Sequence, residues 1–233
     1  MNPVRPATWI LCAALSGSFA VTASAQVVTS NLLTNPGAES GNLAGWTVVS
    51  GNPIVDAGTF NPGLNPRTGG FDFVGGYTNP LGKLSQTVDL IASLQVTAMD
   101  LDSGLVTADA SFWEQGLNQG ATSDNAAIKL TFLDSLGSAI GSATSSTIDS
   151  HSGSWTNGML SSIAVPVGTR SITYTMFFQR VVGADNDSYI DDNSLTLTIP
   201  VPEPGSVALL LAGLPCLVLA GLRRRNSRRQ REF

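Results

Sequence analysis

Hydrophobic and polar residues alternate over several short stretches in the middle of the chain. A period of two is typical of β-strands that bury one face and expose the other. The clearest runs are KLSQTVDL (83–90), LVTADASFWEQ (105–115), AAIKLTFLD (126–134), SITYTMFFQR (171–180) and SYIDDNSLTLTI (188–199). Clusters rich in Gly, Pro, Asn and Ser separate these runs and predict turns. The pattern therefore predicts an all-β fold, an antiparallel jelly-roll β-sandwich.

Local signals add detail to this prediction. Ser135, Leu136 and Gly137 lie between two strand-like runs, so we expect a hairpin there. No segment keeps a helical period long enough to predict a helix. Trp46 is expected to fill the core beneath the first strand, and a core position within ADASFWEQ (108–115) is one interpretation of Trp113.

The N-terminus has the pattern of an export signal rather than of a strand. A basic start, MNPVR, is followed by the apolar stretch ATWILCAALSGSFAV (7–21) and by ASA just before Gln26. These are the three parts of a secretory signal peptide, with cleavage after Ala25. A buried N-terminal helix is the alternative interpretation.

The C-terminus has the pattern of a membrane anchor. Residues 205–222 contain no charge, and a helix of that length spans about 27 Å, close to the ~30 Å thickness of the hydrocarbon layer. Six arginines follow and are expected to hold that end in the cytoplasm. We therefore divide the chain into a signal peptide (1–25), a β-sandwich domain (26–200) and a C-terminal segment (201–233).

The order of features in this last segment resembles the PEP-CTERM sorting signal of Gram-negative bacteria. The resemblance implies that signal peptidase and an exosortase process the chain, and that an inner-membrane helix precedes release to the cell surface or extracellular matrix. It also implies an association with exopolysaccharide. A plain membrane anchor with a Pro-rich hinge is the alternative. The residues that match the sorting signal are Pro202, Glu203, Pro204, Arg223, Arg224 and Arg225.

Charge and cysteine usage narrow the function of the middle domain. Between Gln26 and Pro200 the chain has five basic and 15 acidic residues, a formal charge of −10. Such a surface repels phosphate backbones, so we expect no nucleic-acid partner. Cys12 and Cys216 both lie outside the domain, which must therefore be held by its core, with or without a metal, and not by a disulfide.

The middle domain as a whole resembles the galactose-binding-like sandwich of many carbohydrate-binding modules. The resemblance is carried, in order, by NLLTNPGAESGNLAGWTV (31–48), KLSQTVDL (83–90), AAIKLTFLDSLGSAIG (126–141) and the closing strand pair (165–197). It implies one structural calcium ion held by a glutamate of the opening motif and an aspartate of the last strand. The matching residues are Glu39 and Asp191, with Asp192 as the other possibility.

The strand period gives separate support to a calcium site. If no bulge intervenes, Asp191 lies on the same face as Leu195 and Leu197. An inward carboxylate needs a partner, and calcium takes carboxylate and carbonyl oxygens. The alternative is that Glu39 caps a turn and the two aspartates are exposed to solvent.

Sugar sites combine exposed aromatic faces with hydrogen-bonding side chains. Asn65 and Arg67 lie near several aromatic residues that we expect in loops. Those aromatic candidates are Phe60, Phe71, Tyr77, Trp113 and Trp155.

The sequence gives no sign of catalysis. His151 is the only histidine, and the chain contains no G-x-S-x-G motif. We therefore expect a protein that is not an enzyme and that binds carbohydrate outside the cell. The alternative is a structural or adhesive surface protein with no small-ligand site.

Overall fold

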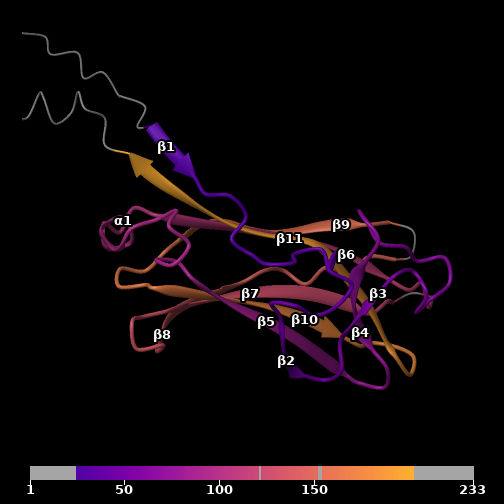
Figure 1. Cartoon of the computed structure of the whole chain (residues 1–233). Helices are drawn as coiled ribbons and strands as arrows, with labels where there is room; N and C mark the ends of the chain where they lie inside the picture. The colour runs from indigo at the N-terminus through magenta and orange to yellow at the C-terminus, as the bar shows by residue number, and fades with distance from the viewer. Residues whose placement is uncertain (1–24, 121, 152–153, 202–233) are drawn as a thin grey trace, which may run out of the picture.

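The computed structural model describes residues 25–120, 122–151 and 154–201, which form two packed β-sheets (Figure 1). Every strand pair in these residues is antiparallel. The prediction of an all-β antiparallel sandwich is therefore confirmed. The elements are β1 (Ala25–Val28), β2 (Thr47–Ser50), β3 (Ile54–Asp56), β4 (Asp72–Gly76), β5 (Leu81–Asp89), α1 (Ala98–Asp102), β6 (Thr107–Gly116), β7 (Asn125–Leu133), β8 (Ala139–Thr144), β9 (Thr156–Ala164), β10 (Ser171–Gln179) and β11 (Asn186–Val201).

Neither sheet follows the order of the strands in the sequence. One sheet has the order β3-β4-β11-β6-β9, with β1 added at the end of β11. The other sheet has the order β2-β5-β10-β7-β8. The long strand β11 thus lies between β4 and β6, and it brings segments that are far apart in the chain onto one surface (Figure 1).

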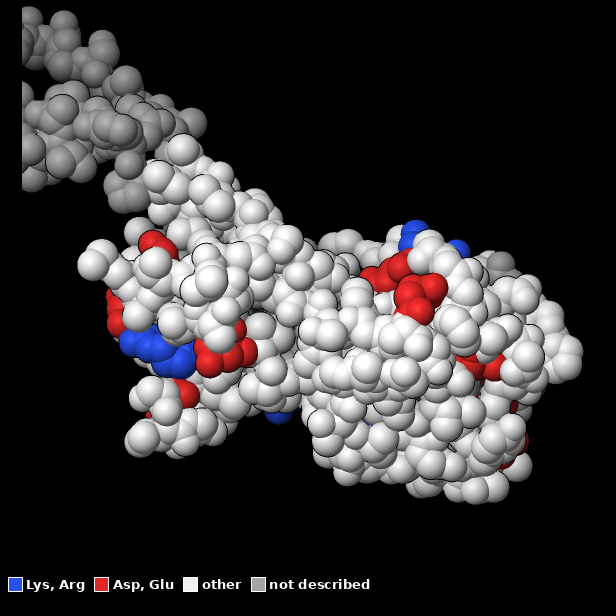
Figure 2. Space-filling view, viewed as in Figure 1, with Lys and Arg blue, Asp and Glu red and all other residues white. Residues whose placement is uncertain are grey.

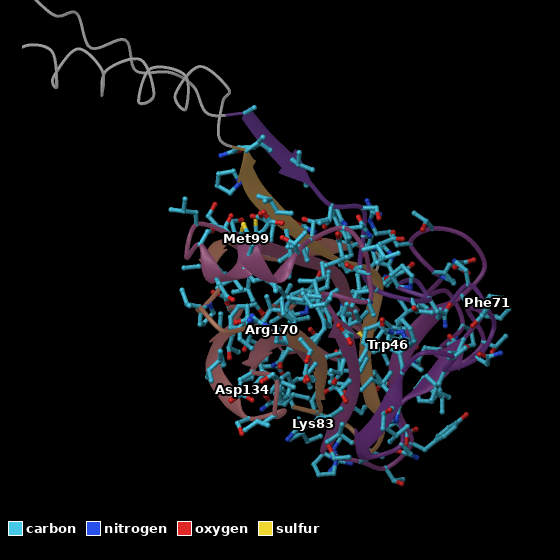
Figure 3. All side chains as sticks on the ribbon, turned by 60° about the vertical axis from the view of Figure 1, so that its left-hand side comes forward. Trp46, Phe71, Lys83, Met99, Asp134 and Arg170 are labelled. Carbon is cyan, nitrogen blue, oxygen red and sulfur yellow. The ribbon has the colours of Figure 1, made fainter. Side chains whose placement is uncertain are left out.

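The core lies between the two sheets and follows the alternation seen in the sequence. In β10, Ile172, Tyr174, Met176 and Phe178 are fully buried, whereas the residues between them face outward. Trp46 is also buried, and its ring packs edge-on against those of Phe73 (5.5 Å) and Tyr174 (5.9 Å). The predicted core position of Trp46 is therefore confirmed, and Figure 3 shows this residue within the body of the sandwich.

The hairpin predicted at Ser135–Gly137 is present, because β7 pairs with β8 on either side of it. Gly137 there has a φ of 78°, which favours glycine. The helix α1, by contrast, was not expected. It has only five residues, too few to display a helical period, and it is held by a capping box between Thr97 and Asp100.

The predictions for the two ends fall largely outside the described residues. Ala25 and Gln26 begin β1, which pairs with the end of β11. Residues 1–24, the sorting motif at Pro202–Pro204, the apolar segment 205–222 and Arg223–Arg225 are not described. Within the ranges that are described, no helix has the length and apolar character needed to cross a membrane.

Candidate functional site

A bulge in β11 decides which way the predicted calcium ligand points. The pairing with β6 shifts between Asp191 and Ser194, and Asp192 adopts a φ of 48°. One extra residue reverses the alternation, so Ile190, not Asp191, shares the inner face with Leu195. The expectation that Asp191 lies on the face of Leu195 is therefore wrong. Asp191 lies instead on the outer face of the six-stranded sheet.

Asp191 is nevertheless fully buried, because the backbone of a loop lies over it. Its Oδ2 accepts hydrogen bonds from the backbone N–H groups of Arg67 (2.9 Å) and Thr68 (3.2 Å). The alternative of a solvent-exposed Asp191 is thus also wrong. The neighbouring Asp192 pairs with the Arg67 guanidinium at 2.5 Å and accepts a bond of 2.7 Å from the Thr68 hydroxyl.

Glu39 holds the next part of the same loop. Its carboxylate accepts the backbone N–H groups of Gly70 (3.0 Å) and Phe71 (3.2 Å). The three acidic residues predicted from the family resemblance therefore converge on one segment, 67–71. In this arrangement they order the loop that crosses the outer face of the six-stranded sheet.

Asp72, which the sequence analysis did not single out, lies among these carboxylates. It is only 1% exposed, and its Oδ1 has no hydrogen-bond partner. Burial, followed by the charges of Asp191, Asp56 and Glu39, raises its pKa to about 9. Burial and the charge of Asp192 likewise raise the pKa of Asp191 to about 7, although backbone hydrogen bonds oppose this shift.

An orphaned buried carboxyl oxygen beside other carboxylates is an environment that a hard cation would stabilise. Asp72 and Asp191 fit the carboxylate part of a calcium site. In the part of the chain that the structure describes, however, no three His, Cys, Asp or Glu side chains form a metal-holding group by themselves. Calcium here would also need carbonyl or amide oxygens, which it accepts readily.

The structure brings together three of the five aromatic candidates. The rings of Phe60 and Tyr77 lie 4.7 Å apart, and that of Phe60 lies 6.4 Å from Tyr189. Trp155 packs against the same small hydrophobic cluster, which contains Leu64 and Tyr189. Tyr77 is 55% exposed, so its ring is accessible at this end of the sandwich.

The other two aromatic candidates lie elsewhere. Phe71 is half-buried and packs against the main core, with its ring over Gly41. Trp113 was expected in a loop or in the core, but it lies on the outer face of β6, where it is the register partner of Asp191. The Arg67 guanidinium stacks 3.7 Å from the centre of its ring.

The charged side chains on the face shown in Figure 2 gather in a few places and leave much of that face uncharged.

Next to Trp113 on the same face lies a groove that the sequence analysis missed. It crosses β11, β6 and β9 and has a volume of about 290 Å³. Ser111, two residues before Trp113, lies opposite Ser194 on one side and Met159 on the other. We call this feature the outer-sheet groove. Its polar and exposed side chains are Asp109, Ser111, Asn157, Met159, Ser161, Ser194 and Thr196.

Two of these polar side chains are held in place. The Asp109 carboxylate accepts the Ser162 backbone N–H at 2.9 Å, and the Asn157 amide donates to the Phe112 carbonyl at 3.1 Å. Met159 is 59% exposed and offers an apolar contact. The groove thus combines oriented hydrogen-bonding groups with a soft apolar surface, a combination that suits a polyhydroxylated ligand.

No family model matches the chain, and no curated protein matches it. Solved structures with a similar fold include TmCBM61 in complex with beta-1,4-galactotriose (22% identity, 72% of this chain, 98% of that chain, TM-score 0.48). Another is the CBM22-1 xylan-binding domain from Paenibacillus barcinonensis (15% identity, 78% of this chain, 100% of that chain, TM-score 0.46). A third is a cyclase from Fischerella sp. TAU (12% identity, 76% of this chain, 100% of that chain, TM-score 0.47).

Proposed function

We propose that this chain is an exported, non-catalytic protein that binds a polysaccharide in its outer-sheet groove. The observation that carries the proposal is the groove itself. Hydroxyl, amide and carboxylate groups line it beside the exposed thioether of Met159. Polar groups of this kind bind sugar hydroxyls, while an apolar side chain contacts the C–H faces of the ring.

The charge of the domain favours a neutral polysaccharide. The groove contains Asp109 and no basic residue, and the domain as a whole is strongly acidic. An anionic chain would be repelled by both. Trp113 lies beyond the groove on the outer face of β6, where it is half-buried and the Arg67 guanidinium covers one face of its ring.

We also propose one structural calcium ion beside Asp191 and Asp72, with Glu39 ordering the adjoining loop. The ion would stabilise the segment that carries Arg67, and through Arg67 the orientation of Trp113. This proposal is supported by the orphaned Oδ1 of Asp72 and by the convergence of carboxylates on residues 67–71. Chelation should then lower the melting temperature of the wild type by more than it lowers that of Asp191→Asn.

Export and sorting belong to the same proposal. The order of Pro-Glu-Pro, an uncharged stretch and an arginine cluster supports processing by an exosortase, after signal peptidase has acted at Ala25. The galactose-binding-like jelly roll would then be displayed at the cell surface or in the matrix of a Gram-negative bacterium. There it would hold exopolysaccharide.

The test begins with a glycan array, supplemented with soluble xylan and β-1,4-galactan as neutral probes and polygalacturonate as an acidic one. Met159→Ala and Thr196→Val remove groove contacts without touching the core. Each should weaken binding of a neutral glycan about 2- to 10-fold, the equivalent of roughly 0.5–1.5 kcal/mol.

Tyr77→Ala, at the aromatic loop cluster, is the matched control and should leave the affinity unchanged. Loss of binding in Tyr77→Ala alone would move the site to the loops. No glycan binding, together with self-association of the chain, would favour the structural or adhesive alternative.

A further inference from the structure

Glu114 is a buried acid on the inner face of β6, opposite to the side that carries Trp113. It is 0% exposed, and neither of its carboxyl oxygens has a hydrogen-bond partner. Its register partners are Ile190 on one side and Thr156 on the other. A carboxylate removed from water without donors is costly, so this position needs a compensating charge or a bound proton.

The surroundings of Glu114 supply oxygen atoms. Gly116, two residues further along the same face, lies opposite Ser188, whose buried Oγ also has no partner. The carbonyl oxygens of Asp124 and Ser150 lie 2.6 and 2.9 Å from the point where a Cβ on Gly116 would stand. Because Gly116 has no side chain, these two carbonyls can lie close against the inner face of β6, the face that Ser188 also shares.

A second carboxylate lies near these oxygen atoms, because it is bound by Ser123, whose Cβ lies 3.0 Å from the same point at Gly116. Asp149 is exposed, and its Oδ1 accepts a hydrogen bond of 2.5 Å from the Ser123 hydroxyl. Burial, followed by the charge of Asp149, raises the pKa of Glu114 to about 9, and the nearby Ser150 N–H opposes this shift without reaching hydrogen-bond geometry. Among the described residues, the salt bridges involve Arg67 and Arg170, and neither pairs with Glu114 or Asp149.

We infer that Glu114 and Asp149, with the Ser188 hydroxyl and the carbonyls of Asp124 and Ser150, form a second cation site. A set of donors made only of oxygen, with two carboxylates among them, suits a hard divalent ion such as calcium. This site is separate from the one beside Asp191, because Glu114 lies on the inner face of the sheet and Asp191 on the outer face. It does not depend on sugar binding.

Calorimetric titration of calcium into the full chain, purified in a neutral detergent and stripped with chelator, tests this inference. Glu114→Gln keeps the size of the side chain and removes its charge. The variant should bind one calcium ion fewer per chain than the wild type. The same loss should appear when Glu114→Gln is added to Asp191→Asn, whether or not Asp191 itself binds an ion.

Equal calcium stoichiometry in Glu114→Gln and the wild type would overturn the inference and identify Glu114 as a neutral buried acid. If Glu114→Gln fails to fold, Asp149→Asn becomes the deciding variant, because Asp149 is exposed and its substitution leaves the core intact. It should weaken one calcium site at least tenfold, whereas Asp102→Asn, at the exposed Arg170 pair, should not. Unchanged calcium affinity in Asp149→Asn would again overturn the inference.

Discussion

Single residues explain where the polar groups of this sandwich depart from a simple pattern. Asn193 alternates with Leu195 and Leu197, so this polar residue points inward among apolar ones and is buried. Its Oδ1 lies 2.9 Å from the Tyr174 hydroxyl, and its amide donates to the Pro36 carbonyl at 2.8 Å. A polar residue in the core is thus accommodated by partners from other segments. No local pattern in the sequence could have revealed those partners.

Asp72 should make the stability of the metal-free protein depend on pH. Its folded pKa is about 9, above the ordinary 3.8, so folding favours the protonated form. The contribution of protonated Asp72 to the free energy of unfolding is fully present below about pH 4 and is lost as the pH rises towards 9. In chelator, Asp72→Asn should therefore be more stable than the wild type at pH 8, by about 1–3 kcal/mol, and closely similar at pH 4.

Urea unfolding at the two pH values measures this difference directly. A difference between variant and wild type that stays constant from pH 4 to pH 8 would contradict the role assigned to Asp72. With saturating calcium, Asp72→Asn should also show a smaller calcium-dependent rise in melting temperature than the wild type.

At the scale of elements, the long strands with a regular alternation were predictable, and the short or irregular features were not, including the nine-residue strand β9. Alternation indicated β5, β6, β7, β10 and β11, because each buries one face over nine residues or more. The short strands β2 and β3 have four and three residues, which is too few for a period to show. The sequence did not reveal the bulge at Asp192, because a bulge of one residue does not change the kinds of residue that the strand contains.

The helix α1 depends on its capping box. The Thr97 hydroxyl accepts the Asp100 N–H at 3.2 Å, and the Asp100 carboxylate accepts the Thr97 N–H at 2.9 Å. Thr97→Ala removes the hydrogen bond from the Asp100 N–H to the Thr97 hydroxyl and should lower the free energy of unfolding by about 0.5–2 kcal/mol.

Met99→Ala is the matched control in the same helix, because Met99 is 83% exposed and should change stability by less than about 0.5 kcal/mol. Chemical denaturation of both variants supplies the comparison. Equal stability of Thr97→Ala and Met99→Ala would mean that the cap contributes nothing.

At the scale of the whole molecule, the groove arises from pairing between distant segments. Its lining comes from residues 109–111, 157–161 and 194–196, which become neighbours only because β6 pairs with both β9 and β11. The aromatic cluster of Phe60, Tyr77 and Trp155 is likewise assembled from three separate loops or loop ends. The sequence supplied residue types suited to sugar binding, but strand order decided which of them meet.

The two ends of the described chain also meet, since Ala25 pairs with Val201 (Figure 1). The described part of the chain therefore begins and ends at the same end of the sandwich. If the proposed sorting signal operates, replacing Arg223, Arg224 and Arg225 with glutamine should disturb membrane retention and C-terminal processing, because these positive charges would orient the predicted anchor. Cell fractionation and the mass of the mature protein are the measurements. Unchanged fractionation and mass would count against a sorting signal.

The central claim is that the outer-sheet groove binds a polysaccharide, and filling the groove tests it most directly. Ser111→Trp places a large side chain in the groove, whereas Thr173→Trp places the same side chain on the outer face of the other sheet. Both positions face outward from the middle of a strand, so the two variants carry similar structural costs.

Affinity electrophoresis of the folded proteins in gels containing xylan or β-1,4-galactan is the measurement. The proposed site predicts that the neutral polysaccharide retards the wild type and Thr173→Trp, and that Ser111→Trp migrates as it does in a gel without polysaccharide. Equal retardation of Ser111→Trp and the wild type would show that the groove is not where the polysaccharide binds.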